Sequence, residues 1–333
     1  MNNLYITGTD TYLKVQDQHL LVFHPHKPCC KVAVNQVNNL VLIGYCKRSD
    51  KAIHFALSRC IPVLFLDDKG NYFGRIETEE RRRVKYLAHQ LKRAKDIEFT
   101  TGIAESIVRA KLHNSCALLR QFSHCHQTKA TQTALDTITL LIDNLPLANS
   151  VDVLRGYGQT ATKLYFQSVG SLFAGAINFD QPTQHLPTHP INSLLNLGYT
   201  LLNQNIYALL QAVGLHSHFG NLHIHRDHHP ALVADFMEEF SALLVDALVV
   251  DLVILQLFTP ADFTLPDARG GVYLYPNAIN KFIKYWEKTL QSEVNHLYAG
   301  TVNYQQCLEW QVQEYLSCLL GEREFYRPFL SKK

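Results

Sequence analysis

Paired cysteines are missing from this sequence: its eight cysteines are scattered, and none forms a Cys-x-x-Cys motif. This spacing excludes a zinc knuckle and a thioredoxin-like redox motif. The chain also lacks a basic region followed by an apolar core at its start, so we expect no secretory leader and no disulfide framework. These absences favour a protein of the reducing cytoplasm.

Long apolar runs are missing too. The most apolar stretch, residues 249–258, is interrupted by Asp251 and Gln256 and is too short to span a bilayer, so we expect no membrane association. There is no internal repeat and no low-complexity tract. With 333 residues, of which 47% are hydrophobic, the chain is long and apolar enough to form two domains with real cores.

Basic side chains are absent from residues 231–268. This stretch contains no Lys, Arg or His but seven acidic residues: Asp235, Glu238, Glu239, Asp246, Asp251, Asp262 and Asp267. Its first part is long and apolar enough to predict a buried helix rather than a strand. Carboxylates on such a helix cost free energy unless they are paired or coordinate a cation, and no basic residue lies within helical reach.

The spacing of these acids predicts a metal site. Asp235 lies three residues before Glu238 and four before Glu239, which places the three on one side of the helix. His223 lies just upstream and could close onto that side. A histidine facing clustered carboxylates suggests a site for a hard or borderline divalent cation, Mn²⁺ or Mg²⁺. A simpler alternative is that the Glu238-Glu239 pair faces water and the histidines of this loop form a surface cluster.

Positive charge is concentrated elsewhere. Residues 75–95 contain eight basic residues against three acidic ones, although the whole chain carries a net charge of only +2. Such a patch, separate from an acidic pocket, suits a protein that contacts phosphate on one surface and binds metal at another. A solvated helix face explains the basic run as simply. The candidate DNA-binding residues are Arg81, Arg82, Arg83, Lys92 and Arg93.

The pattern of apolar residues predicts an α+β protein with two domains. Residues 1–77 are expected to form a small β-rich domain, residues 78–95 a basic linker or helix, and residues 96–333 an all-α domain. Polar, Pro-containing loops should interrupt the helices at residues 180–190 and 259–271. The expected β-strands cover residues 4–6, 12–15, 20–23, 31–34, 40–43, 62–66 and 72–76, with a helix at residues 51–60.

An ordered set of short motifs runs over essentially the whole chain. It comprises LYI (4–6), LRG (154–156), AT (161–162), YF (165–166), PINSLLNLGYTLL (190–202), GL (214–215), GNLH (220–223), ADFMEEF (234–240) and YRPF (326–329). Each motif is weak alone, but the set in this order resembles the CRISPR-associated integrase/endonuclease family, the catalytic core of the spacer-acquisition complex.

This resemblance implies that the β-rich N-terminal domain, residues 1–77, serves dimerisation and that the helical domain, residues 96–333, is catalytic, so the chain is expected to form homodimers. Two dimers bracket a small ferredoxin-like CRISPR-associated partner in a heterohexamer, which captures short double-stranded DNA fragments and inserts them into a repeat array for antiviral defence. Each insertion is a transesterification by a 3′-hydroxyl. A Mn²⁺ or Mg²⁺ ion stabilises the charge that develops at the phosphorus, and no covalent enzyme intermediate is needed.

The family's metal ligands are a Glu, a His and an acid from the following helix. The last two correspond to His223 and Glu238, whereas alignment on the flanking motifs places Gly158 where the family has its Glu. The sequence therefore leaves two functions open. One is an active, metal-dependent endonuclease and integrase. The other is a weakened member that serves as a DNA-binding or scaffolding subunit.

Overall fold

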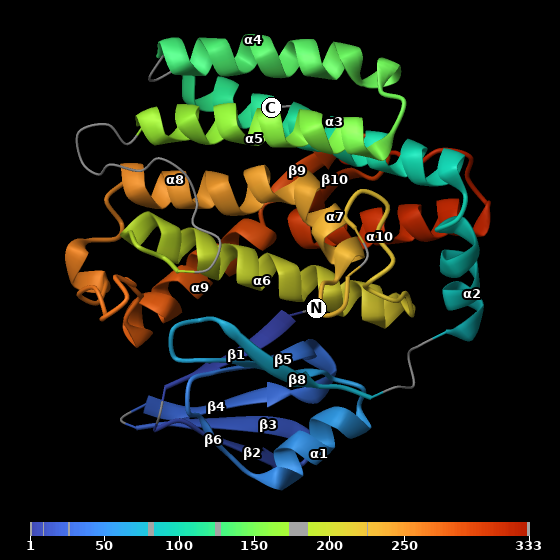
Figure 1. The fold of residues 1–333 in the computed structure, drawn as a ribbon. Coiled ribbons are helices and arrows are strands. Elements are labelled where there is room, and N and C mark those ends of the chain that lie inside the picture. The colour runs from blue at the N-terminus through green and yellow to red at the C-terminus, as the bar shows by residue number, and fades with distance from the viewer. Residues whose placement is uncertain are drawn as a thin grey trace.

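The structure is a computed structural model, and it describes residues 2–8, 10–25, 27–78, 83–123, 128–172, 186–224 and 226–331. Figure 1 shows the strands of the N-terminal part below a stack of helices, with α2 along one edge of the molecule between the two parts. The elements of the N-terminal part are β1 (Asn2–Thr7), β2 (Tyr12–Gln16), β3 (His19–His24), β4 (Lys27–Ala33), β5 (Val37–Ile43), β6 (Lys47–Arg48), α1 (Asp50–Ser58), β7 (Val63–Leu66) and β8 (Tyr72–Ile76).

The strands form two four-stranded sheets, with strand orders β1-β5-β7-β8 and β4-β3-β2-β6. Successive side chains of a strand point to opposite faces of its sheet, and β5 shows what this achieves. Leu40 and Leu42 belong to the apolar cluster of the N-terminal part, whereas Val41 and Ile43 belong to the cluster of the helices. The β1-β5-β7-β8 sheet is therefore the layer that joins the strands to the helical part.

The strand expected at residues 31–34 begins earlier than the sequence suggests. The observed β4 spans Lys27–Ala33 and includes Pro28. Proline lacks the N–H that a central strand needs, which argues against a strand at this position. Proline is tolerated in edge strands, and β4 lies at the end of its sheet, next to β3 alone, so the strand can extend through the proline.

The remainder of the described chain is largely helical. Its elements are α2 (Val84–Arg93), α3 (Ile97–Ser123), α4 (Lys129–Asn144), α5 (Val151–Leu172), α6 (Pro190–Val213), α7 (Ala231–Phe240), a π-helical turn (Ser241–Asp246), α8 (Ala247–Ile254), α9 (Pro276–Leu290), β9 (Glu293–His296), β10 (Gly300–Asn303) and α10 (Tyr304–Leu320). The β9–β10 hairpin is an addition that the sequence pattern did not predict.

The helix predicted at the acidic stretch is α7, which packs against α3 and α6 and continues through the π-helical turn into α8. Its apolar side chains Leu232, Val233, Phe236 and Phe240 are all fully or almost fully buried. This burial fixes the orientation of the helix, and with it the direction in which each carboxylate points.

The predicted α+β fold class, β-rich first and then helical, is confirmed. The division into separate domains at residues 77 and 95 stays a prediction. Among the described residues, no helix has both the length and the apolar character needed to cross a bilayer.

Candidate active site

His223 lies in the loop between α6 and α7, and two glycines shape this loop. Gly214 ends α6 in the left-handed conformation, with φ of +94°, which glycine adopts without steric cost. Gly220 lies so close to the start of α7 that a Cβ there would be 2.8 Å from the carbonyl carbon of Ala231. The loop therefore sits against the first turn of α7, and His223 faces that helix.

Asp235 is the residue that fixes His223. Its carboxylate is fully buried and accepts hydrogen bonds from the backbone N–H groups of Asn221, Leu222 and His223. It also accepts from Nδ1 of the His223 ring, at 2.8 Å. Since Nδ1 carries the proton of this bond, the Nε2 atom of the neutral ring is left as the free donor of an electron pair.

The charge state of His223 follows from the same contacts. Burial by itself disfavours the charged ring, but the hydrogen bond and negative charge of Asp235, together with the charge of Glu238, outweigh it and raise the pKa of His223. The imidazolium form is thus favoured at a higher pH than for an exposed histidine.

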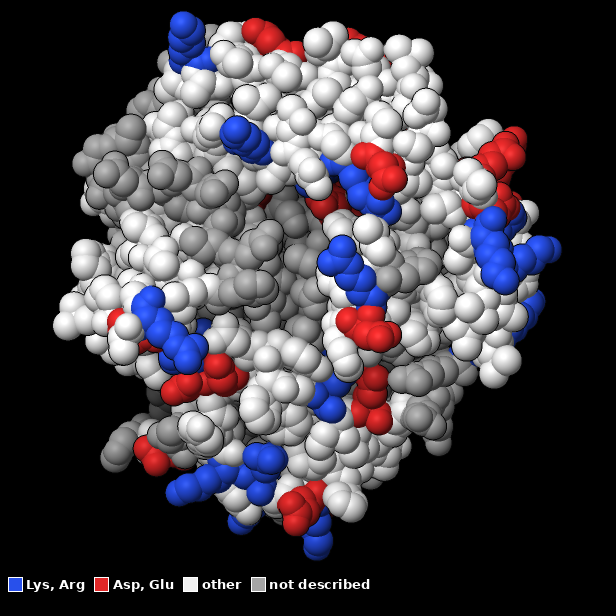
Figure 2. All heavy atoms as spheres, viewed as in Figure 1, with Lys and Arg blue, Asp and Glu red and all other residues white. Residues whose placement is uncertain are grey.

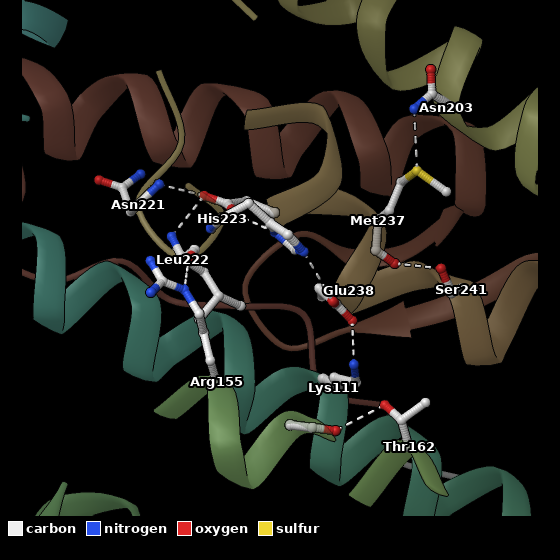
Figure 3. Close-up of polar contacts among 12 residues, drawn as sticks. Lys111, Arg155, Thr162, Asn203, Asn221, Leu222, His223, Met237, Glu238 and Ser241 are labelled. Atoms are coloured by element: carbon white, nitrogen blue, oxygen red, sulfur yellow. Dashed lines mark hydrogen bonds and ion pairs between the residues drawn. The ribbon is translucent and has the colours of Figure 1, made fainter. Parts of the chain in front are cut away.

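Glu238 lies between two positively charged or chargeable groups (Figure 3). Its Oε1 atom is 3.6 Å from Nε2 of His223, and its Oε2 atom is 2.8 Å from Nζ of Lys111, which comes from α3. The three side chains form a row that joins the loop, α7 and α3. The structure thus brings together His223, Glu238 and Asp235, the three residues predicted from the sequence.

Gly158 lies on α5, next to Lys111. A Cβ built on Gly158 would have Cδ and Nζ of Lys111 as its nearest neighbours, each at 3.9 Å. The Gly158 carbonyl accepts a hydrogen bond of 2.8 Å from the Thr162 hydroxyl, one turn along α5. The charged group nearest to Gly158 is therefore the ammonium of Lys111 rather than a carboxylate.

A cavity of about 340 Å³ opens beside these residues, and its lining includes Lys111, His223, Glu238 and Asp246. Asp246 is buried and accepts hydrogen bonds from the hydroxyls of Tyr165 and Tyr199. Burial raises the pKa of Asp246 to about 6, against the opposing effect of the two tyrosine hydrogen bonds. The cavity thus contains carboxylates in two different environments, one beside cations and one beside phenols.

The donors present do not form a complete site for a divalent ion. No group of three or more His, Cys, Asp and Glu side chains suited to a metal occurs among the described residues. His223 and Glu238 are suitable donors for a hard or borderline cation, but all the close contacts of Asp235 are already made by N–H groups. The remaining charged group beside Glu238 is the ammonium of Lys111, which repels a cation.

Comparison with known proteins decides the family. The chain matches the family described as CRISPR associated protein Cas1 over residues 4–288. The chain belongs to the Cas1 family.

Two curated relatives illustrate the match. The chain is 27% identical over 338 residues to a CRISPR-associated exonuclease Cas4/endonuclease Cas1 fusion of Geobacter sulfurreducens, covering 99% of this chain but 60% of the fusion. It is also 27% identical over 326 residues to a CRISPR-associated endonuclease Cas1 of Thermus thermophilus, covering 98% of both chains.

Solved structures show the same fold. A chain of a Cas6-RT-Cas1--Cas2 complex superposes with a TM-score of 0.84 at 24% identity, covering all of this chain and 36% of that one. A casposase bound to integration product superposes with a TM-score of 0.82 at 20% identity, covering 98% and 93%. At these identities the likeness establishes the Cas1 fold and not the roles of single residues.

One acidic residue predicted to share the site lies elsewhere in this Cas1 fold. Glu239 is buried on a different side of α7, where it accepts hydrogen bonds from the Tyr326 hydroxyl, the Gln311 amide and the Phe329 N–H. Residues i and i+4 share a helix face, but the 100° step between Glu238 and Glu239 was enough to send one carboxylate to the cavity and the other to the C-terminal segment.

The candidate DNA-binding residues are only partly visible. Arg81 and Arg82 lie outside the described residues. Arg83 and Lys92 are exposed, whereas Arg93 forms an ion pair of 2.8 Å with Asp96. On the face shown in Figure 2, the Lys and Arg side chains drawn in blue occur in small groups, several of them beside acidic side chains drawn in red, rather than as one continuous band.

Sequence reasoning missed two basic residues that shape the site of this Cas1 chain. Lys111 is remote in sequence from α7, and nothing in the sequence distinguishes it from the neighbouring basic residues Arg109 and His113. Arg155 donates from Nε to the Leu222 carbonyl at 2.6 Å and so supports the loop just before His223. Helical spacing around α7 could not predict either residue, because Lys111 lies on α3 and Arg155 on α5.

Proposed function

We propose that this chain is a DNA endonuclease and integrase that inserts captured DNA fragments into a CRISPR repeat array, and that the reaction takes place at the cavity beside His223 and Glu238. The observation that carries the proposal is the row formed by Lys111, Glu238 and His223 at that cavity, in a chain of the Cas1 family. The same row lies on three different elements, so its geometry depends on the complete fold.

The chemistry needs positive charge and exact placement more than a nucleophilic side chain. When a 3′-hydroxyl attacks a phosphodiester, one P–O bond forms and another breaks, and negative charge builds up on the phosphoryl oxygens. Lys111 and the protonated form of His223 are placed to attract such oxygens. Asp235 contributes by holding His223 in one orientation, because its carboxylate binds both the ring and the backbone of the same residue.

The resemblance to the family makes Mn²⁺ or Mg²⁺ the expected cofactor, with His223 and Glu238 as its protein ligands. The chain itself supplies two donors and an ammonium at this place. We therefore propose metal dependence as a property to be tested and base no chemical step on it.

The proposed partners are double-stranded DNA, a second copy of this chain and a small ferredoxin-like CRISPR-associated protein that completes a heterohexamer. Support comes from the fold shared with a chain of a Cas6-RT-Cas1--Cas2 complex and with a casposase bound to integration product.

The alternative function is that of a weakened family member that acts as a DNA-binding or scaffolding subunit. The observation that favours it is Gly158, which stands where the family has a metal-binding Glu.

An integration assay tests the proposal. The purified protein is mixed with its small partner, a short DNA duplex with free 3′-hydroxyls, a supercoiled plasmid containing repeat DNA and Mn²⁺ or Mg²⁺. We expect relaxed and nicked products with the fragment joined to the plasmid, loss of product with a chelator, and loss of product in His223→Ala. Binding of both DNAs without any joining would instead establish the scaffolding function.

A further inference from the structure

We propose that Lys111 is a resident cation of this site, which pairs with Glu238 in the space beside Gly158 and thereby limits the affinity of the site for a divalent ion. The inference rests on the proposed function, because it takes the cavity to be the place where DNA and a divalent ion meet. It concerns a residue to which neither the sequence motifs nor the family resemblance assigns a role.

The ammonium is held by Glu238 and lies next to the backbone position of Gly158. Nζ of Lys111 is 2.8 Å from Oε2 of Glu238, and it would be 3.9 Å from a Cβ on Gly158. The side chains of Lys111 and Glu238 are only 19% and 22% exposed, so this pair is far less open to solvent than an ordinary surface ion pair. Figure 3 shows the row Lys111–Glu238–His223 crossing the site without interruption.

The other carboxylates near the cavity are already engaged. Asp235 accepts four hydrogen bonds from N–H groups of the His223 loop, and Asp246 accepts from two tyrosine hydroxyls. Glu238 is therefore the carboxylate on which a cation in this cavity depends, and the cation that it holds in the structure is Lys111.

A single carboxylate cannot serve two cations equally well. A divalent ion that binds Glu238 and His223 has to displace the ammonium or accept its repulsion at a distance of a few ångströms. Both outcomes weaken binding. Removing the charge of Lys111 should therefore strengthen the binding of a divalent ion, the opposite of what is expected if Lys111 only stabilises the fold around Glu238.

The direct test is a Mn²⁺ titration of the whole protein without DNA, with free Mn²⁺ followed by its electron paramagnetic resonance signal. Lys111→Met keeps the length of the side chain and removes its charge, and we expect at least a tenfold tighter dissociation constant. Lys111→Arg keeps the charge and should bind Mn²⁺ as weakly as the natural chain. Lys163→Met, at an exposed position of α5, is the matched control for loss of one positive charge and should change little.

A second variant, which adds a carboxylate next to Lys111, is also expected to bind Mn²⁺ more tightly. In Gly158→Glu, the new Cβ makes ordinary van der Waals contact with Lys111, so there is room for the first atom of the side chain. A carboxylate at this position can pair with the ammonium, which frees Glu238, or act as a further ligand for the divalent ion. We expect Mn²⁺ binding to tighten at least tenfold here as well. Adding Glu238→Gln to Lys111→Met should abolish the gain, which locates it at this site.

Unchanged or weaker Mn²⁺ binding in Lys111→Met, in protein whose circular dichroism spectrum and melting curve match those of the natural chain, would overturn the proposal. So would equal tightening in Lys111→Arg. If Lys111→Met does not fold, Lys111→Gln, which also removes the charge, is measured in its place, and unchanged Mn²⁺ binding there would overturn the proposal equally. The measurement needs no catalysis, so a failure of the proposed integrase function would appear separately, as absence of joined DNA while Mn²⁺ binding follows the prediction.

Discussion

At the scale of single residues, Asp235 determines the geometry of the site more than any group that faces the cavity. Its side chain touches no solvent, yet it binds three consecutive backbone N–H groups and the ring of His223. Because this carboxylate accepts four hydrogen bonds, it holds both the backbone of the loop and the His223 ring in place. The Nε2 atom of the ring points to Glu238 as a consequence.

Replacing this carboxylate by an amide should weaken the attachment of the His223 loop to α7. In Asp235→Asn, an NH₂ group faces N–H donors, so buried donors lose their acceptor. We expect the free energy of unfolding to fall by about 3 kcal/mol and the rate of DNA joining to fall roughly 10- to 100-fold. Urea unfolding and the integration assay measure the two effects. Asp136→Asn, at an exposed position of α4, is the control, and equal behaviour of the two variants would contradict the role of Asp235.

Much of the site could be predicted at this scale. The spacing of Asp235 and Glu238 and the position of His223 upstream were sufficient to predict that they meet, because local periodicity governs where helix side chains point. Lys111 and Gly158 could not be combined with them in the same way. Their approach depends on how α3 and α5 pack against α7, which is a property of tertiary packing and leaves no periodic signal in the sequence.

At the scale of elements, α7 carries two adjacent glutamates into opposite environments. Glu238 lies beside two cations at the cavity, whereas Glu239 is buried among hydrogen-bond donors of α10 and the C-terminal segment. Burial raises the pKa of Glu239 to about 7, although the hydrogen bonds from Tyr326, Phe329 and Gln311 oppose the shift. One helix thus links the cavity to residues 326–329.

This raised pKa predicts how stability depends on pH. Between pH 4.5 and about 7 the folded chain keeps a proton on Glu239 that the unfolded chain releases, so the free energy of unfolding falls as pH rises through this range. The contribution is fully present below pH 4.5 and lost above about pH 7. Its steepest slope is about 1.4 kcal/mol per pH unit.

Glu239→Gln should therefore unfold with a shallower pH dependence than the natural chain, as measured by urea unfolding at closely spaced pH values from 4.5 to 7.5. Asp246, whose pKa is raised to about 6, and His223, whose pKa is also raised, contribute in the same direction, so part of the slope remains in this variant. Parallel curves for Glu239→Gln and the natural chain would show that Glu239 does not hold the proton.

Element types were also largely predictable, with informative exceptions. The change from period 2 to period 3.6 after the last strand of the N-terminal part separated strands from helices correctly. The early start of β4 and the β9–β10 hairpin were missed for a common reason. Pro28 is tolerated because of where β4 lies in its sheet, and β9 pairs with β10 around a turn at Gly300, which has φ of +73°. Both depend on context that short windows of sequence do not contain.

At the scale of the whole molecule, the basic residues before α3 are the candidates for contact with DNA. Lys92 is exposed on α2, and Arg83 is exposed at the residue before this helix. Arg93 forms an ion pair with Asp96. A surface of this kind contributes affinity through the release of counterions and little through recognition of sequence. Its effect should therefore appear in the salt dependence of binding.

Neutralising Arg83, Lys92 and Arg93 to Gln should flatten the plot of log affinity for duplex DNA against log salt concentration. Each phosphate contact contributes about 0.9 to the slope, and because Arg93 is already paired, we expect a change of about 2 for the triple variant. Fluorescence anisotropy between low and moderate salt measures it. Neutralising Lys129, Lys284 and Lys288, which are exposed on other helices, is the control. If the two triple variants have equal slopes of log affinity against log salt concentration, residues 83–93 do not contact DNA and are an ordinary solvated surface.

The most direct test of the central claim is the rate at which the protein resolves a branched DNA, the reverse of integration, with Glu238 as the variable. This reaction requires the cavity and its side chains but not the capture of a new fragment. If DNA strands are joined at the cavity, Glu238→Gln should lower the rate by at least about 100-fold, since groups that act on the transition state typically contribute that much, while Glu322→Gln at an exposed position leaves it unchanged. A rate for Glu238→Gln within twofold of the natural chain would contradict the account.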